Sequence, residues 1–295
     1  MSAPFFIKNR IQTLKEEYDR LRISKDSLLR LIDETELPEG VYNSNAIENS
    51  TLTLKETEKI LLEMEVSKNI SLPAVFEAKN LAKVMEYIGV KSEELSKELI
   101  LLLHQILLGN IDESIAGRFR KNGEYVRIGT FIATAPEQLE LKLDEILIEY
   151  SSNLGMYFVD KIAKFHLDFE LIHSFLDGNG RIGRVLINYQ LKKLGFPPVI
   201  IRNKEKSKYY QAFKEYQDDK KTKVMERILT LAIMESLHKR ITYLKGDTII
   251  ELTECGKKAD RSVQALLNAA RRQTIPAFRE KGVWKIGIRD GKSIC

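Results

Sequence analysis

The residues of this 295-residue chain that could carry out chemistry are concentrated in one segment, His173–Arg184, which reads HSFLDGNGRIGR. Gly178 and Gly180 allow positive φ angles and a close approach of the backbone, and a stretch with helical character follows them. Consecutive backbone N–H groups at the start of a helix bind anions. The segment therefore predicts an anion site at a helix N-terminus.

Four side chains of the same segment extend this prediction. Arg181 and Arg184 are three residues apart, so both guanidinium groups project from one side of the first helical turn toward the same anion. Asp177 suits Mg²⁺, which takes one or two carboxylates and completes its shell with phosphate oxygens. His173 suits a general base, because the ordinary pKa of histidine is about 6.5. Together they predict a site for a polyphosphate, a metal ion and an incoming hydroxyl.

Amphipathic helices must position this segment, since apolar residues recur at helical spacing along most of the chain. Glycine (16) and proline (7) are scarce, which favours long helices. The pattern predicts a break near Ser24, a loop at Leu37–Gly40 and a helix start after Thr53, where Thr53–Glu56 has capping-box spacing. The predicted helices span 6–33, 54–65, 73–88, 93–108, 136–151, 157–173, 182–194, 206–219 and 221–244.

Two parts of the chain depart from the helical pattern. Glu124–Gly129 alternates in the manner of a strand and predicts a short hairpin on an otherwise helical body. Near the C-terminus, a helix over Ser262–Arg272 is followed by two apolar runs around Glu280–Gly282, as in a hairpin; Lys257 and Lys258 are predicted to lie in a turn. This order indicates a small winged-helix-like module.

The charge of the chain is unevenly distributed. Residues 245–295 contain 11 Lys/Arg and 6 Asp/Glu, which accounts for the whole net charge of +5. Two cysteines cannot frame a disulfide scaffold or a zinc site, and no apolar run approaches the length of a membrane span. No secretory signal is seen, so we expect a cytoplasmic protein without membrane contact. The chain has no GxxxxGK(S/T) phosphate-binding loop, which disfavours the kinases and ATPases built on it.

The segment His173–Arg184 resembles the signature of Fic-domain proteins, HxFx(D/E)GNGRxxR, at every charged position. The family usually has proline after the histidine, and here Ser174 stands in its place. The similarity extends to His104, to Ala116–Arg120 and to other stretches between about residues 40 and 220. The chain is therefore identified as a member of the Fic family.

The resemblance implies a mainly α fold: a Fic helical core with a short β-hairpin flap, joined to the C-terminal winged-helix-like module. We expect three regions along the chain. These are an N-terminal helical region with an inhibitory motif at 1–65, the catalytic core at 66–244 and the basic module at 245–295.

The resemblance also implies an enzyme, a protein adenylyltransferase that moves AMP from ATP to a Ser, Thr or Tyr hydroxyl of a target protein. His173 would deprotonate the hydroxyl and Asp177 would hold Mg²⁺. Nucleotide contacts are expected from Gly178, Asn179 and Gly180 around the phosphates (Asn179 on the α-phosphate), Arg181 on the β-phosphate, Arg184 on the γ-phosphate, and Tyr209, Tyr210 and Asn188 near adenine. The flap residues Glu124, Tyr125, Val126, Arg127 and Ile128 would pair with the target as an added strand.

Ser44–Asn49, called the inhibitory segment below, resembles the family's inhibitory pattern (S/T)xxxE(G/N). A Glu48 carboxylate that reaches Arg184 would satisfy the guanidinium needed by the γ-phosphate, with Ser44 as the first residue of the pattern. The same carboxylate could orient a water that removes AMP, which would make the enzyme bifunctional.

One alternative of a different class is a DNA-binding transcriptional regulator whose Fic core senses nucleotide. The C-terminal module could contact DNA or protein, although its charge is modest for a duplex binder. The sequence leaves open the target protein, which could be the chain itself, and whether the chain forms a homodimer.

Overall fold

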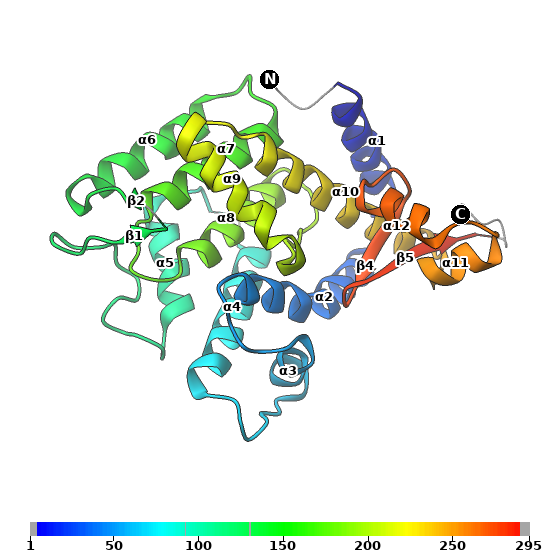
Figure 1. The fold of residues 1–295 in the computed structure, drawn as a ribbon, viewed down its shortest axis with the longest axis horizontal. Coiled ribbons are helices and arrows are strands. Elements are labelled where there is room, and N and C mark those ends of the chain that lie inside the picture. The colour runs from blue at the N-terminus through cyan, green and yellow to red at the C-terminus, as the bar shows by residue number, and fades with distance from the viewer. Residues whose placement is uncertain (1–4, 92, 130, 290–295) are drawn as a thin grey trace.

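The computed structural model describes residues 5–91, 93–129 and 131–289, which form a mainly helical protein with two small antiparallel sheets (Figure 1). The helices are α1 (Phe5–Leu21), α2 (Asp26–Ile47), α3 (Leu54–Glu58), α4 (Leu72–Val90), α5 (Lys97–Leu108), α6 (Leu139–Ser152), α7 (Phe158–Ile172), α8 (Asn179–Lys193), α9 (Lys206–Asp219), α10 (Lys223–Lys245), α11 (Leu252–Lys258) and α12 (Val263–Arg271). Short π and 3₁₀ turns lie at Lys59–Glu63, Pro136–Gln138 and Asn203–Glu205. No helix among these described residues is long and apolar enough to cross a membrane.

The helix boundaries follow local signals in the sequence. Ser24 has a φ of 61° and separates α1 from α2, which confirms the predicted break. The capping box before α3 is also confirmed, because the Thr53 side chain accepts from the Glu56 N–H and the Glu56 carboxylate accepts from the Thr53 N–H at 2.8 Å.

The predicted loop at Leu37–Gly40 is wrong, since α2 continues through Pro38 to Ile47. Proline removes one helical hydrogen bond, but Pro38, Val41 and Ile47 are buried, and this packing outweighs the loss. The predicted turn at Lys257 and Lys258 is wrong as well, because both residues end α11.

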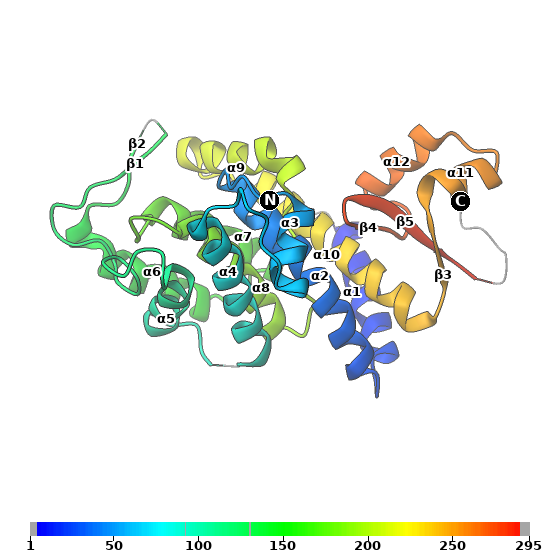
Figure 2. The same cartoon turned by 90° about the horizontal axis from the view of Figure 1, so that it is seen from below.

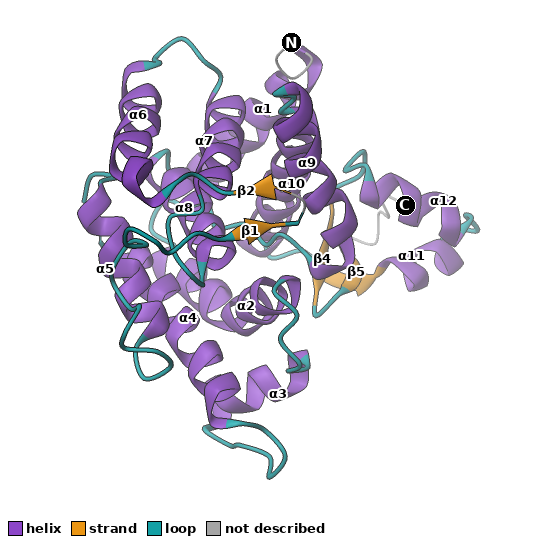
Figure 3. Ribbon diagram, turned by 60° about the vertical axis from the view of Figure 1, so that its left-hand side comes forward, coloured by secondary structure: helices purple, strands orange, loops and turns teal. Residues whose placement is uncertain are grey.

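Helices α7 and α8 pack against each other and lie between α5 and α6 on one side and α9 and α10 on the other (Figure 3). Two hydrophobic cores meet at this pair. One core contains buried residues of α4, α5 and α6, the other buried residues of α9 and α10, and both include side chains of α7 and α8. The loop that joins α7 to α8 is therefore held at both ends by packed helices.

The flap is a hairpin of two-residue strands, β1 (Arg127–Ile128) and β2 (Phe131–Ile132), as predicted. A second sheet has the order β3–β5–β4, with β3 (Thr248–Glu251), β4 (Ala277–Glu280) and β5 (Val283–Ile288). The two sheets lie at opposite ends of the molecule (Figures 1 and 2).

The C-terminal elements β3, α11, α12, β4 and β5 surround a small core of their own. The predicted helix and hairpin are confirmed by α12 and by β4–β5. The description of these elements as a winged helix, and the three regional boundaries, stay predictions.

Candidate active site

The loop between α7 and α8 is shaped by two residues with positive φ. His173 caps α7 with a φ of 52°, and its N–H donates to the Phe169 carbonyl. Gly178 precedes α8 with a φ of 83°, a conformation in which a side chain would be strained. The backbone therefore turns sharply twice, and the N-terminus of α8 opens beside His173, as the sequence predicted.

Asn179 stabilises this loop through hydrogen bonds from its side chain to the backbone. Its side chain accepts from the Phe175 N–H at 2.9 Å and donates to the Phe175 carbonyl at 2.8 Å. Asn179 is almost fully buried, so its side chain maintains the loop, and only its backbone N–H remains for a phosphate. Phe175 is buried and its ring stacks on His104 at 3.7 Å, which anchors the loop in the core.

His104 is a positioning residue that the sequence analysis did not single out as functional. Its Nδ1 accepts from the Gly117 N–H at 3.1 Å, so the proton is on Nε2, which donates to the Asp177 carbonyl at 3.0 Å. Burial lowers the pKa of His104 to about 4, and the ring is neutral at pH 7. The neutral ring thus links the motif loop to the segment that leads to the flap.

The imidazole of His173 is prepared to accept a proton. Nδ1 lies 3.3 Å from the Glu170 carbonyl, an acceptor, so Nδ1 carries the hydrogen and Nε2 keeps its lone pair. Burial lowers the pKa of His173 to about 4, and the positive charge of Arg120 acts in the same direction. His173 is therefore a neutral base over the physiological pH range.

Arg120 ties the flap to the His173 loop, and the sequence analysis missed this role. Its side chain donates to the carbonyls of His173 at 2.8 Å, Glu124 at 2.9 Å and Thr134 at 2.7 Å. Its backbone N–H donates to the Ser174 carbonyl at 2.9 Å. In a sequence, an arginine between a glycine turn and a strand-like stretch is only a weak indication of a structural role, because such arginines usually face solvent.

Asp177 and Arg181 lie at the mouth of the loop. Asp177 accepts from the Gly178 N–H at 2.6 Å and from Arg181 Nη2 at 2.8 Å. The Asp177 side chain is 56% exposed, whereas that of Arg181 is 5% exposed. An accessible carboxylate beside the N-terminus of a helix fits Mg²⁺, which takes one or two protein carboxylates at a phosphate site.

Arg184 is buried and bound by both ends of the inhibitory segment. Its Nε donates to Ser44 Oγ at 2.9 Å and its Nη2 to the Ser44 carbonyl at 2.7 Å. Its Nη1 forms an ion pair with Glu48 Oε1 at 2.9 Å. A β-carbon built on Gly180 would overlap the same Glu48 oxygen. The carboxylate therefore lies directly above the first turn of α8, where the sequence predicts a phosphate.

The three residues predicted near adenine are placed differently from one another. Tyr209 is 1% exposed, and its hydroxyl contacts His166 at 2.8 Å and Arg184 at 3.4 Å. A base cannot stack on a ring in that position, so Tyr209 supports Arg184 instead. Asn188 is bonded in both directions to the backbone of Val199. Tyr210 is 43% exposed and keeps an accessible ring.

Glu170 is a further site residue that the sequence analysis missed. A β-carbon on Gly183 would overlap its Oε1, which is buried without a hydrogen-bond partner among the described residues. Burial, reinforced by the charge of Glu48 and opposed by that of Arg184, raises the pKa of Glu170 to about 8. The site therefore holds a protonated carboxyl beneath the Glu48–Arg184 pair at neutral pH.

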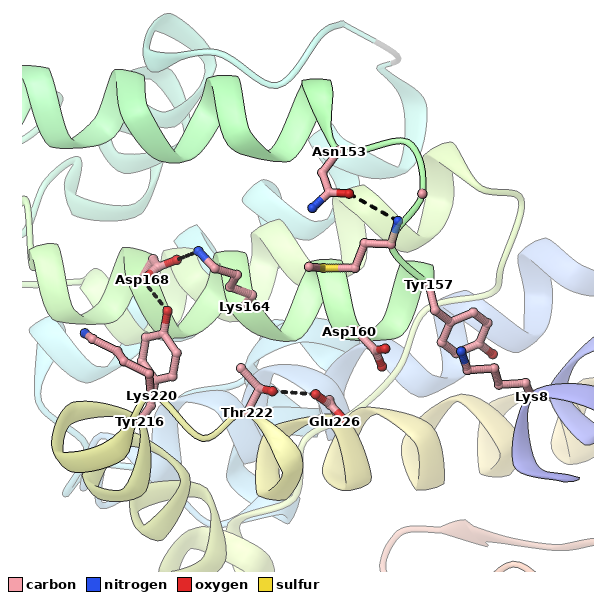
Figure 4. Close-up of a pocket in the computed structure, with 12 residues that line it drawn as sticks. Lys8, Asn153, Tyr157, Asp160, Lys164, Asp168, Tyr216, Lys220, Thr222 and Glu226 are labelled. Atoms are coloured by element: carbon pink, nitrogen blue, oxygen red, sulfur yellow. Dashed lines mark hydrogen bonds and ion pairs between the residues drawn. The ribbon is translucent and has the colours of Figure 1, made fainter. Parts of the chain in front are cut away.

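A cleft of about 850 Å³ lies on another face, between the α6–α7 loop, α7 and the α9–α10 turn (Figure 4). None of the motif residues lines it. Asp168 there accepts from Lys164 at 2.7 Å and from the Tyr216 hydroxyl at 2.6 Å. Because these groups satisfy each other, the chemistry is assigned to the motif loop. Across the described part of the chain no three His, Cys, Asp or Glu side chains gather as a metal site.

Comparison with known proteins agrees with this geometry. Residues 94–191 match the model of the Fic/DOC family. A relative from Drosophila persimilis named Protein adenylyltransferase Fic is 33% identical over 216 residues, 70% of this chain and 42% of the relative. Its namesake from Drosophila willistoni is 35% identical over 64% of this chain and 39% of the relative. The matched part is thus less than half the length of these relatives.

Two solved structures share the fold. A Fic domain containing signaling protein from Bacteroides thetaiotaomicron has a TM-score of 0.73 at 25% identity, over 81% of this chain and 97% of that one. Fic-1 from C. elegans has a TM-score of 0.66 at 26% identity, over 80% of this chain and 72% of that one. The similarity therefore extends well beyond the motif loop.

Proposed function

This chain is a Fic-domain protein, and from that premise we propose that it transfers AMP from ATP to a Ser, Thr or Tyr hydroxyl of a target protein. One observation carries the proposal: a neutral imidazole with a free Nε2 stands beside a glycine loop, a helix N-terminus and two buried arginines. This set suits attack of a hydroxyl on a nucleotide phosphate.

In the proposed reaction His173 Nε2 takes the proton from the attacking hydroxyl. A bond forms between that oxygen and the α-phosphorus, the bond from the α-phosphorus to the pyrophosphate oxygen breaks, and pyrophosphate leaves. The N–H groups of Asn179 and Gly180 would contact the phosphates, with Asn179 acting through its backbone, and the Gly178 N–H would join them on leaving the Asp177 carboxylate. Catalysis of this kind rests on positioning and fixed charge.

Charge on the leaving group would be neutralised by two arginines and a metal ion. Arg181 would face the β-phosphate and Arg184 the γ-phosphate. Asp177 would hold Mg²⁺, which supplies positive charge between the phosphates. Asp177 is paired with Arg181 in the structure, and loss of this pair would free the guanidinium for the nucleotide.

The base and the target would bind on either side of this centre. Tyr210 offers an exposed ring for stacking on adenine, next to the inhibitory segment, since its hydroxyl donates to the Ile47 carbonyl at 3.3 Å. The flap would add the target as a strand beside β1, and Arg120 would keep that strand in register with His173.

We further propose that Glu48 inhibits the transferase by occupying Arg184. A charge-assisted hydrogen bond contributes about 1.5–3 kcal/mol, so its loss to the γ-phosphate corresponds to roughly 10–150-fold in productive ATP binding. In a second role Glu48 would orient a water for removal of AMP from a modified target. Glu48→Gln should abolish that removal, and full removal by the variant would reject the second role.

The proposed function is tested with ATP labelled on the α- or γ-phosphate. Glu48→Gly should incorporate the α-label into protein and no γ-label, the wild type should incorporate little, and Glu48→Gly/His173→Ala none. Incorporation of the γ-label would indicate phosphoryl transfer and overturn the proposal.

The DNA-binding alternative stays a prediction without a specific observation in its favour. Several cations of the C-terminal elements are already paired, namely Arg279 with Glu235, Lys281 with Glu58 and Lys285 with Glu280. The Mg²⁺ requirement, the regional boundaries and a cytoplasmic location are likewise proposals.

A further inference from the structure

The turn of the C-terminal hairpin, Lys281 and Gly282, is bound to the helix that carries the inhibitory segment. Both residues have positive φ, and their N–H groups donate to the two carboxylate oxygens of Glu39 at 3.0 and 2.9 Å. Glu39 lies in α2 and is only 4% exposed. One buried carboxylate thus joins α2 to the tip of the hairpin.

A buried network of charges reinforces this junction. Arg202 forms ion pairs with Glu39 and, at 2.9 Å, with Glu235, and Arg279 of β4 pairs with Glu235 at 2.6 Å. All four side chains are 12% exposed or less. Removing one member of such a network leaves a buried charge unpaired, so the hairpin and α2 hold each other in one position.

The same turn also reaches the other side of the inhibitory segment. Lys281 Nζ pairs with Glu58 at the end of α3 at 3.0 Å. Glu39 precedes Glu48 in the chain and Glu58 follows it. The hairpin turn therefore bridges the two helices that flank Glu48, without touching the active site itself.

We propose that the C-terminal hairpin sets the strength of the inhibition by holding α2 and α3 in the position from which Glu48 reaches Arg184. This inference rests on the proposed function, because it describes regulation of the same site. Displacement of the hairpin would loosen the segment between the two helices and release Arg184 to the γ-phosphate. The C-terminal elements would then act as the regulatory part of the transferase.

Lys281→Glu tests the proposal, because it places a negative charge against Glu39 and Glu58. Lys281 is 68% exposed, so the variant should fold; Lys281→Ala is a milder version. Lys257→Glu is the matched control, with the same charge change at an exposed position of α11. Two readouts are measured on the full chain: α-label incorporation, and hydrogen exchange at the amides of Glu48, Asn49 and Ser50, which donate to the last turn of α2.

Lys281→Glu should speed exchange at these amides and raise α-label incorporation by about 2- to 10-fold, and Lys281→Ala should do less. Lys257→Glu should do neither. Added to Glu48→Gly, Lys281→Glu should give no further increase in labelling. Unchanged hydrogen exchange in a folded Lys281→Glu chain would overturn the proposal. So would faster exchange in Lys281→Glu with no increase in α-label incorporation, provided that Glu48→Gly does incorporate the label. If Glu48→Gly itself does not label, the proposed function fails and the regulatory inference fails with it; faster exchange would then show only that the hairpin holds the inhibitory segment in place.

Discussion

The carboxylate of Glu48 lies directly above Gly180, so close that a β-carbon on this glycine would overlap Oε1. Gly180 is helical and does not have a positive φ, so its backbone conformation does not require glycine. The lack of a side chain instead leaves the space above the first turn of α8 open. The space that admits Glu48 is the one that a phosphate at this helix N-terminus would need. Under the proposed function, Glu48 and a nucleotide phosphate would therefore compete for one place.

The depressed pKa of His173 predicts the pH dependence of transfer. With a pKa of about 4 rather than about 6.5, the imidazole stays neutral down to mildly acidic pH. In the Glu48→Gly chain we expect kcat/KM to show no titration of His173 between about pH 5.5 and 7.5. The rate should fall only nearer pH 4, where the imidazole becomes protonated. An acidic limb centred near pH 6.5 would show that His173 is solvated and would contradict the structure.

Acid should destabilise the fold through its histidines. Burial lowers the pKa of His104, His173 and His238 to about 4 and that of His166 to about 3. Between pH 6.5 and 4 the unfolded chain therefore binds more protons than the folded one, and stability falls as pH falls, by at most about 1.4 kcal/mol per pH unit for each histidine. Thermal melts across this range measure the loss. His238→Gln, a substitution remote from the motif loop, should reduce the slope of stability against pH by the contribution of one histidine. An unchanged slope would contradict the burial of His238.

Glu170 should make ATP binding sensitive to alkaline pH. Its carboxyl, with a pKa of about 8, is neutral at pH 7, and ionisation above pH 8 adds a negative charge beside the phosphate site. ATP affinity of the wild type should fall by about 3- to 10-fold between pH 7 and 9, which corresponds to about 1 kcal/mol of repulsion. Glu170→Gln should bind equally at both pH values in a fluorescence titration. A parallel loss in both proteins would assign the effect to another group.

Asn179 should be needed for both stability and transfer. Asn179→Ala leaves the buried N–H and carbonyl of Phe175 without their partner, which should cost about 1–3 kcal/mol in the free energy of unfolding. Asn80→Ala is the matched control, because the buried Asn80 side chain also makes two hydrogen bonds to the backbone, in this case to the carbonyls of Leu107 and Gly109. Both variants should melt earlier, but in the Glu48→Gly background Asn179→Ala alone should lose most α-label transfer. Equal transfer by the two would show that the loop does not depend on Asn179.

Much of this site could be predicted from the sequence because its chemistry is local. The sharp turn at Gly178 and the helix after it follow from neighbours in one short segment, although α8 begins at Asn179, three residues before the predicted start. The ion pair between Asp177 and Arg181 was not predicted. The contact of Glu48 with Arg184 was predicted, although it joins distant parts of the chain, because the resemblance supplied the inhibitory pattern.

What the sequence did not show depends on burial in three dimensions. Helix α2 passes through Pro38 because Val41 and Ile47 are buried, which periodicity alone cannot weigh against a proline. Tyr209 and Tyr210 are adjacent and chemically equal in the sequence, yet one is buried and the other exposed. Glu170 resembles any helical glutamate until Gly183 of α8 is placed against it.

The competition at Arg184 is tested most directly by calorimetric titration of ATP and AMP into His173→Ala, which cannot turn over, with and without Glu48→Gly. Releasing Arg184 should tighten ATP binding by roughly 10–150-fold and change AMP binding little, because AMP has no γ-phosphate. Equal tightening of both nucleotides, or none for ATP, would show that Glu48 does not occupy the γ-phosphate position.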